Sequence, residues 1–561
     1  MYRLLILLWG LLLAGCASPL VPAAHNPWPR RYQLSDAELL DCLRKSWVRL
    51  GASSITDEER TLVMHQYNKD LLHLIRRLRH DAAAGELSAE LGVEVQDAST
   101  PGRLCAGYDD VVPAADVVLR SLRERYTLAG IGVPMVGIIP QQEQVQGGPL
   151  SVCAHGTVCA LTAVLSFPER SRPLLRFVPL RQRVTMRIGA WNYPLAADWS
   201  APMEVYWDLT RVRENRLVGL LRPQELRDST GLLAMEPYNP DKIPVVLTHG
   251  LASSPGTFDN LVNRLLSEPG IRQNFQFWYY NYPTGVAWTV SARGFRESLE
   301  RLRAQVDPLK MNPNWKHMVL VGHSMGGLIT HYSQCVEPWN LLRAADIPDE
   351  KLRRYLKPTY VDAPFADSAL EPLRGDYFFR PVEAGLVVYM ATPHRGAPVA
   401  RYCIVTLLSK LVTLPQTLLK EAYNIATLQQ DMLILNPSNV YLWFTSINQL
   451  NPESYSIRGL QGLSVRAAHT HSIIGSGGAE CPRCTDGVVP YWSSHLSWGS
   501  QTIVPADHSV QNSRETADDL ILLLRKYAET HPAVMASGPH KQRALPRCTE
   551  PVNRPSSAVS R

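Results

Sequence analysis

A serine between glycines follows a short apolar run, and it is the strongest chemical signal in the chain. The segment Gly322–Gly327 has the sequence Gly-His-Ser-Met-Gly-Gly, and the run Met318–Val321 before it is typical of a buried strand. A serine on a tight turn between a strand and a helix is raised above the sheet, where its hydroxyl can act as a nucleophile. Side chains at Gly322 and Gly326 would clash with the neighbouring strand and helix. The pattern therefore predicts Ser324 as a nucleophile.

A second signal lies further back, where the loop Thr248–Leu251 follows the short apolar run Val245–Leu247. Attack on a carbonyl group places negative charge on its oxygen, and preformed N–H donors stabilise that charge. We expect the backbone amides of Leu251 and Met325 to be these donors. Losing one such donor can raise the barrier by about 2.7–4 kcal/mol. His249, in the same loop, is expected to pack or hydrogen-bond locally rather than act as a base.

Together these segments resemble the α/β-hydrolase superfamily, and within it the bacterial esterases and lipases. The resemblance is carried by His249–Leu251, by the turn around Ser324, and by Ala391–Gly396, which is similar to the loop after the sixth strand in many bacterial lipases. It covers residues 240–530. The resemblance implies an α/β fold, the α/β-hydrolase fold, with a mostly parallel sheet and helices on both of its faces.

In that fold the acid and the base follow the nucleophile in the order Ser, Asp, His. Asp486 lies in Thr485–Pro490, which is similar to the acid-bearing loop of bacterial lipases, and His508 comes just after the predicted last strand, Thr502–Val504. The separation of 22 residues (508 − 486) is enough for a loop, a strand and a return. The resemblance thus implies a Ser324, Asp486 and His508 triad.

Other polar residues compete for these roles. His394 lies after the preceding strand, where the fold does not place its base, and we expect it to hold the loop beside the serine. His471 opens a predicted strand and is expected to pack. Asp507 adjoins His508, but adjacent side chains in an extended turn diverge, so Asp507 is a poor orienter for that imidazole.

The catalytic region is predicted over residues 236–531, because strands and helices alternate there as in a parallel sheet covered on both faces. Within it, the apolar stretch 397–460 is either a mobile lid over an acyl pocket or a buried cap. A polar, disordered tail is expected over 532–561.

Two accessory regions are predicted before the catalytic region. Residues 35–125 are expected to be helical, opening on a capping box at Ser35–Glu38 and ending in a helix over Asp116–Arg125. Residues 126–235 are expected to be rich in β-structure. The predicted strands there are Thr157–Phe167, Arg183–Ile188, Glu204–Trp207 and Leu217–Leu221.

The first residues predict export and a lipid anchor. Residues 1–15 have a basic start and an apolar core of signal-peptide length, and they end in small residues before Cys16. This pattern resembles the lipobox of bacterial lipoproteins, in which Cys16 carries the lipid, and 16–34 is expected to be a tether. Ala17 is similar to the residue of lipoproteins sorted to the outer membrane. We therefore expect a membrane-anchored protein of the bacterial envelope.

Composition excludes other classes of protein. The net charge of +6 is small for 561 residues and comes without a dense basic stripe, so nucleic acid is not an expected partner. Export permits disulfides. Cys481 and Cys484 have no second close Cys or His pair, so a loop staple or two thiols is favoured over zinc. No metal or organic cofactor is expected.

The sequence therefore predicts a serine esterase or lipase whose partners are an ester or lipid substrate and a membrane. Two alternatives stay open. An acyltransferase or thioesterase would use the same acyl-enzyme, and a non-catalytic envelope lipoprotein would bind a partner through a hydrolase scaffold.

Overall fold

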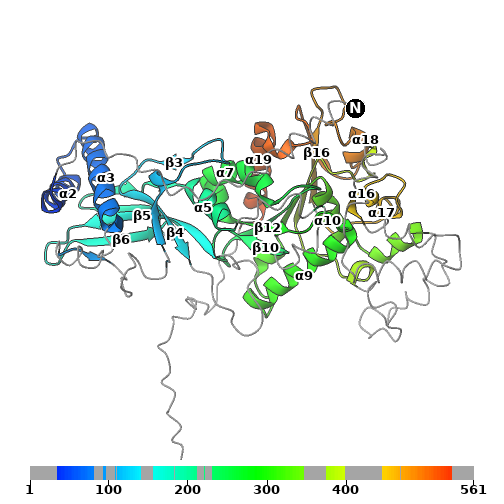
Figure 1. Ribbon diagram of the computed structural model, residues 1–561, viewed down its shortest axis with the longest axis horizontal. Helices are drawn as coiled ribbons and strands as arrows, with labels where there is room; N and C mark the ends of the chain where they lie inside the picture. Colours follow the sequence, from blue (N-terminus) through cyan, green and yellow to red (C-terminus); the bar gives the residue numbers. More distant parts are fainter. Residues whose placement is uncertain are drawn as a thin grey trace, which may run out of the picture.

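The computed structural model describes residues 34–80, 92–95, 108, 110–139, 156–181, 183–210, 220, 230–345, 375–398, 445–467 and 469–532. The molecule is elongated, with an N-terminal unit at one end and a larger α/β unit at the other (Figure 1).

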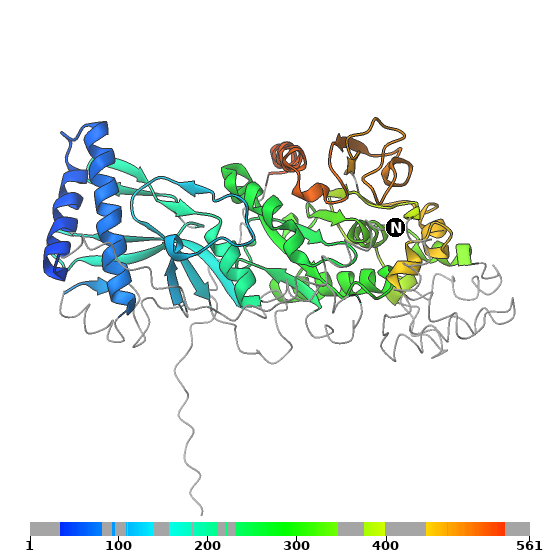
Figure 2. The same ribbon diagram turned by 45° about the horizontal axis from the view of Figure 1, so that its top comes forward.

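The N-terminal unit is a five-stranded sheet covered by two helices. Helices α2 (Asp36–Gly51) and α3 (Asp57–His80) run side by side at the far end (Figure 2). The predicted capping box is confirmed, since the Ser35 hydroxyl accepts from the Glu38 N–H (3.3 Å) and the Glu38 carboxylate accepts from the Ser35 N–H (2.7 Å). The sheet order is β1-β6-β5-β4-β2. Its strands are β1 (Glu94–Val95), β2 (Asp110–Pro113), β4 (Val133–Ile139), β5 (Thr157–Ser166) and β6 (Leu174–Pro179), and the two-stranded ribbons are β3 (Thr127–Leu128) with β9 (Ala197–Asp198) and β7 (Thr185–Ile188) with β8 (Trp191–Pro194).

The helices and this sheet share one hydrophobic core. Leu39 and Leu74 pack in the same cluster as Leu161, and all three are fully buried. Tyr67 of α3 donates to the Leu165 carbonyl (2.6 Å) and accepts from the Leu165 N–H (2.9 Å). The predicted division into a helical region, 35–125, and a β-rich region, 126–235, is therefore wrong, because the apolar helix faces are buried against the sheet.

Two elements predicted in this unit are also wrong. The expected helix Asp116–Arg125 is a short 3₁₀ turn, η1 (Ala114–Asp116), followed by irregular chain, in which the Ser121 amide and hydroxyl both donate to Glu204 (3.3 and 2.8 Å). The expected strand Glu204–Trp207 lies in helix α5 (Ala201–Thr210), because a short apolar run does not distinguish a strand from a buried helix. Of the predicted strand 217–221, all but Leu220 lies outside the described residues.

The larger sheet has seven strands in the order β10-β12-β11-β13-β14-β15-β16. Strand β10 pairs antiparallel with β12, and every other pairing is parallel. The strands are β10 (Gly231–Ala234), β11 (Ile243–Thr248), β12 (Phe275–Asn281), β13 (Val319–His323), β14 (Leu386–Met390), β15 (His469–Gly475) and β16 (Ser500–Val504). The predicted boundary at residue 236 is wrong, because β10 already belongs to this sheet.

Helices cover both faces of the larger sheet. Alternate strand residues enter two separate cores, with Val246 and Leu320 on the face of α9 and α10, and Val245 and Val321 on the face of α7, α8 and α19. The helices are α7 (Asp259–Ser267), α8 (Pro269–Asn274), α9 (Trp288–Val306), α10 (Met325–Ser333), α16 (Ser446–Gln449), α17 (Tyr455–Leu460), α18 (Tyr491–Ser494) and α19 (Arg514–Thr530), and the 3₁₀ turns are η5 (Pro255–Phe258), η6 (Pro313–Trp315), η7 (Pro338–Ala345) and η10 (Val510–Asn512).

Helix α5 joins the two units. Trp207 is 2% exposed and lies edge-on to Tyr279 of β12, with 5.1 Å between the ring centroids. The core on this face of the larger sheet also takes in Val136 and Val158 of the N-terminal sheet. The N-terminal unit is therefore packed onto the α/β unit through a shared apolar core.

Several predicted segments lie outside the described residues. They are 1–33 with Cys16, the central part of the predicted lid (399–444) and the tail after 532. Within the parts of the chain that the structure describes, no helix has the length and apolar character needed to cross a bilayer.

Candidate active site

The chain turns sharply at Ser324, between the end of β13 and the start of α10. Its backbone has φ 54° and ψ −125°, a conformation that is costly for a residue with a side chain. The Ser324 N–H donates to the Met390 carbonyl (2.8 Å), and its carbonyl accepts from the Gly327 N–H (2.9 Å). These bonds hold the strained turn between two strands and a helix.

The glycines on both sides allow this turn because there is no room for a side chain. A Cβ on Gly326 would lie 2.1 Å from the Thr248 carbonyl oxygen and 2.4 Å from that of His249. A Cβ on Gly322 would lie 2.5 Å from Cα of Gly327. Helix α10 therefore starts in direct backbone contact with the loop after β11.

The structure brings Ser324, His508 and Asp486 into one chain of hydrogen bonds, although they lie up to 184 residues apart. His508 Nε2 is 2.9 Å from the Ser324 hydroxyl oxygen, and His508 Nδ1 is 2.8 Å from Asp486 Oδ2. Because a carboxylate only accepts, Nδ1 carries the proton and Nε2 is left to accept from the serine. The serine hydroxyl thus faces Nε2, the ring nitrogen of His508 that is turned away from Asp486.

Asp486 is fixed by its own loop. It is 4% exposed, and its Oδ1 accepts from the backbone N–H groups of Val488 (2.8 Å) and Val489 (2.7 Å). A Cβ on Gly475, at the end of β15, would lie 2.8 Å from Cβ of Asp486. The carboxylate therefore sits against the end of β15 with one oxygen bound to the backbone and the other turned to His508.

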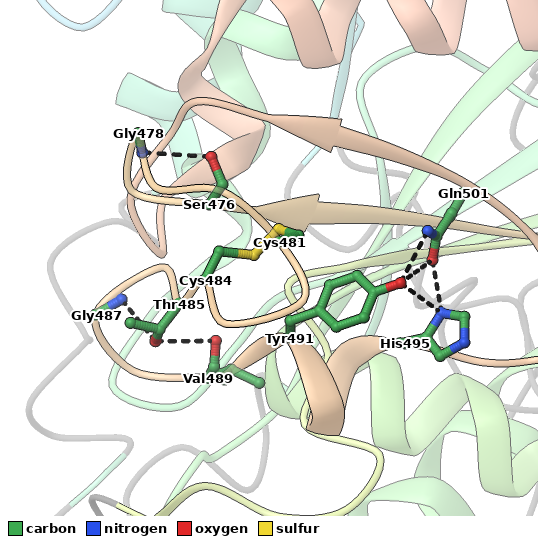
Figure 3. The surroundings of a disulfide bond; sticks show 10 residues. All are labelled: Ser476, Gly478, Cys481, Cys484, Thr485, Gly487, Val489, Tyr491, His495 and Gln501. Atoms are coloured by element: carbon green, nitrogen blue, oxygen red, sulfur yellow. Dashed lines mark hydrogen bonds between the residues drawn. A yellow bond between two sulfur atoms is a disulfide. The ribbon is translucent and has the colours of Figure 1, made fainter.

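A disulfide between Cys481 and Cys484 closes a short loop directly before Asp486 in the chain (Figure 3). Beyond the acid, the Tyr491 hydroxyl and the His495 imidazole meet the amide group of Gln501 on β16 (Figure 3). The acid-bearing loop is thus stapled on one side and tied to the edge strand on the other. The sequence left a staple and two thiols open for this pair, and the structure has the staple.

Met325 directly follows the serine as the first residue of α10, and Leu251 belongs to the loop after β11. A Cβ on Gly250 would be 2.9 Å from Cβ of Ser324, so the loop after β11 touches the serine side chain. Among the described residues, neither the Leu251 nor the Met325 N–H has a hydrogen-bond acceptor.

The competing polar residues have other partners. His249 stacks on Tyr282, with ring centroids 4.4 Å apart. His394 Nδ1 is 2.9 Å from Nδ1 of His331, and burial holds the pKa of His394 well below its ordinary value. His471 Nε2 lies 3.0 Å from Asp519 Oδ2, and the Asp507 carboxylate accepts from the Ser509 N–H (2.9 Å).

Two residues without a predicted role also contact the elements of this site. His323, inside the serine motif, places its Nε2 2.8 Å from the His508 carbonyl oxygen. Arg395, in the loop after β14, donates to the carbonyls of Trp492 and His495, both at 2.7 Å. Arg395 showed no signal beyond its place in the Ala391–Gly396 segment, whereas His323 was visible as the residue directly before the serine.

The described residues contain no group of three or more His, Cys, Asp or Glu side chains arranged to hold a metal ion.

Comparison with known proteins adds likenesses of structure. No protein-family model matches the chain, and no curated protein matches it. The mature lipase BlEst2 of Bacillus licheniformis is 12% identical, with 52% of this chain and 97% of that one covered and a TM-score of 0.30. Esterase B of Lactobacillus rhamnosis is 12% identical over 59% of this chain and 94% of that one, with a TM-score of 0.29. A thioesterase domain from the curacin biosynthetic pathway is 13% identical over 51% of this chain and 92% of that one, with a TM-score of 0.24.

The parallel sheet with one antiparallel strand at its edge, the serine turn between β13 and α10, and helices on both faces define the α/β-hydrolase fold. The predicted fold class is thus confirmed. The chain is an α/β-hydrolase-fold protein that carries an N-terminal accessory unit.

Proposed function

We propose that the protein is a serine hydrolase that cleaves carboxylic esters through an acyl-enzyme. The observation that carries this proposal is the unbroken chain from the Ser324 hydroxyl through His508 to Asp486, with the serine on a strained turn. Strain at a functional turn is maintained only where the surrounding structure enforces it.

In the proposed reaction, His508 Nε2 takes the proton of Ser324 as the hydroxyl attacks the ester carbonyl. Asp486 keeps the imidazole in the Nδ1–H tautomer and stabilises the imidazolium that forms. The Leu251 and Met325 amides bind the oxyanion. His508 then gives its proton to the leaving alcohol, and water releases the acyl group from the serine by the same route.

Labelling with a fluorophosphonate probe tests the nucleophile directly. We expect the full-length protein in detergent to be labelled and to hydrolyse p-nitrophenyl esters, and we expect Ser324→Ala to do neither. The control is Ser509→Ala, which alters an exposed serine close to His508 in the chain and should be labelled normally. A folded wild-type protein that neither labels nor hydrolyses esters would refute the proposal.

The acceptor decides between hydrolysis and transfer, because the acyl-enzyme is common to both. Adding an alcohol acceptor and measuring the ester formed against the acid released separates the esterase from an acyltransferase. Thioester substrates tried beside matched oxygen esters test the thioesterase alternative. We propose hydrolysis rather than transfer, because hydrolysis needs only water as its second substrate.

We further propose that Cys16 anchors the enzyme to a membrane of the bacterial envelope. Support comes from the basic start, the apolar core and the small residues that precede this cysteine. Metabolic labelling with an alkyne fatty acid should mark the wild type and leave Cys16→Ala unmarked. Equal labelling of the two proteins would exclude this anchor.

A further inference from the structure

His323 contacts the proposed base through its backbone. This residue ends β13, is 6% exposed, and lies with its ring 5.1 Å from the His508 ring, centroid to centroid. Its Nε2 atom is 2.8 Å from the His508 carbonyl oxygen. The residue before the nucleophile thus holds the main chain of the base, which lies 185 residues away in sequence.

The direction of this bond follows from its partners. A carbonyl oxygen only accepts, so Nε2 of His323 carries the proton and donates it. Burial, reinforced by the neighbouring His508 imidazole, lowers the pKa of His323 to about 3, so its ring is neutral near pH 7. The bond therefore holds His508 without placing a positive charge beside the imidazolium that the proposed reaction forms.

The opposite edge of the ring is fixed by packing. Nδ1 of His323 is buried and has no hydrogen-bond partner among the described residues. A Cβ on Gly250 would lie 3.1 Å from this atom, so the loop after β11 closes over it. The ring is clamped between this loop and the His508 backbone, which leaves little freedom for the donor to move away.

We propose that His323 is a positioning residue that sets the place of the His508 imidazole between Ser324 and Asp486. The proposal rests on the proposed function, since it assigns His323 a role in the same reaction. The imidazole must reach the serine hydroxyl and the carboxylate with both of its nitrogens at once, and fixing the His508 carbonyl removes motion of the loop that carries it.

Three variants test this role. His323→Leu removes the donor and keeps an apolar side chain of moderate size. His323→Gln keeps an N–H donor at about the distance of Nε2, whereas His323→Asn is polar but too short to reach the carbonyl. We expect kcat for a p-nitrophenyl ester to fall about tenfold to a hundredfold in the Leu and Asn variants, because small misplacements of a catalytic group cost this much. KM should change little, and Gln should restore most of kcat.

A purely structural role would give a different pattern. It would lower the melting temperature without separating Gln from Asn in kcat, and such a result would overturn the proposal. The control is His331→Gln, a buried histidine of α10 that contacts His394 rather than His508 and should keep the wild-type kcat. If His323→Leu does not fold, the Gln and Asn pair still decides.

The wild-type protein separates the two proposals. If it reacts with the fluorophosphonate probe and hydrolyses esters while all three variants match its kcat, the positioning role is wrong and the proposed function stands. If the folded wild type neither reacts nor hydrolyses, the proposed function itself is wrong.

Discussion

Replacing Asp486 by Asn should move the proton of the His508 ring from Nδ1 to Nε2 while leaving the fold intact. Oδ1 of Asp486 faces two backbone donors, the N–H groups of Val488 and Val489. The Asn carbonyl oxygen must take this place, because an NH₂ group there would leave two buried N–H groups without acceptors, at about 1–3 kcal/mol each. The NH₂ group then faces His508 Nδ1, where the carboxylate was 2.8 Å away.

The consequence is a base in the wrong tautomer. Facing a donor, Nδ1 of His508 becomes an acceptor, and its proton moves to Nε2, which points at the Ser324 hydroxyl. The serine then has no lone pair to receive its proton. The same change in a serine protease lowers kcat about 10⁴-fold. We expect a similar loss here, which corresponds to about 5 kcal/mol of transition-state stabilisation.

The assay is kcat for a p-nitrophenyl ester, with thermal unfolding as the check on folding. Asp507→Asn is the matched control, because this neighbouring carboxylate is exposed and accepts only from the Ser509 N–H among the described residues. The control should retain wild-type kcat. A folded Asp486→Asn protein whose kcat stays within tenfold of wild type would refute the reasoning.

Three further predictions concern stability. Trp207→Ala should lower the free energy of unfolding by about 3–5 kcal/mol in urea titrations, because it leaves a cavity between the two units. Leu209→Ala, at a position that is 43% exposed on the same helix, should change this free energy little, and equal effects of the two variants would contradict the shared core. Changing Cys481 and Cys484 together to Ser should cost about 2 kcal/mol from the short loop that the bond closes, and should lower kcat more than it changes KM, whereas an unchanged kcat would show that the staple does not hold the acid. Burial lowers the pKa of His331 to about 4, so below pH about 6.5 the unfolded chain binds a proton that the folded chain does not. As the pH is lowered from about 6.5 to about 4, the contribution of His331 to the free energy of unfolding should therefore fall by about 1.4 kcal/mol per pH unit. Melting temperatures measured across this range should fall less steeply for His331→Gln than for the wild type.

Much of the larger unit could be predicted because its signals are local. Apolar runs of strand length alternate with amphipathic stretches, and the buried strands β11 and β13 were both placed to within two residues at each end. The serine turn was visible because only glycine fits on both sides of it, and the clashes at Gly322 and Gly326 show this reason directly.

The N-terminal unit was predicted less well because its order comes from contacts distant in sequence. The segment after Asp116 had a helical pattern, but Ser121 is held by Glu204 of α5, and tertiary hydrogen bonds of this kind override local propensity. Strand β10 was assigned to the wrong region because its partner, β12, lies some 40 residues further along the chain. The local sequence pattern of a strand does not predict which sheet the strand joins.

The sequence by itself determined the types of the reacting groups, their order along the chain and the turn that raises the serine, because each depends on a few adjacent residues. Only the tertiary structure decided the directions of the bonds. The bond from His508 to Asp486, the bond from His323 to the His508 backbone and the burial of Trp207 against Tyr279 all join residues that are distant in sequence. Hydrogen bonds and packing act over a few ångströms in space whatever the separation in sequence, so these features exist only once the chain has folded.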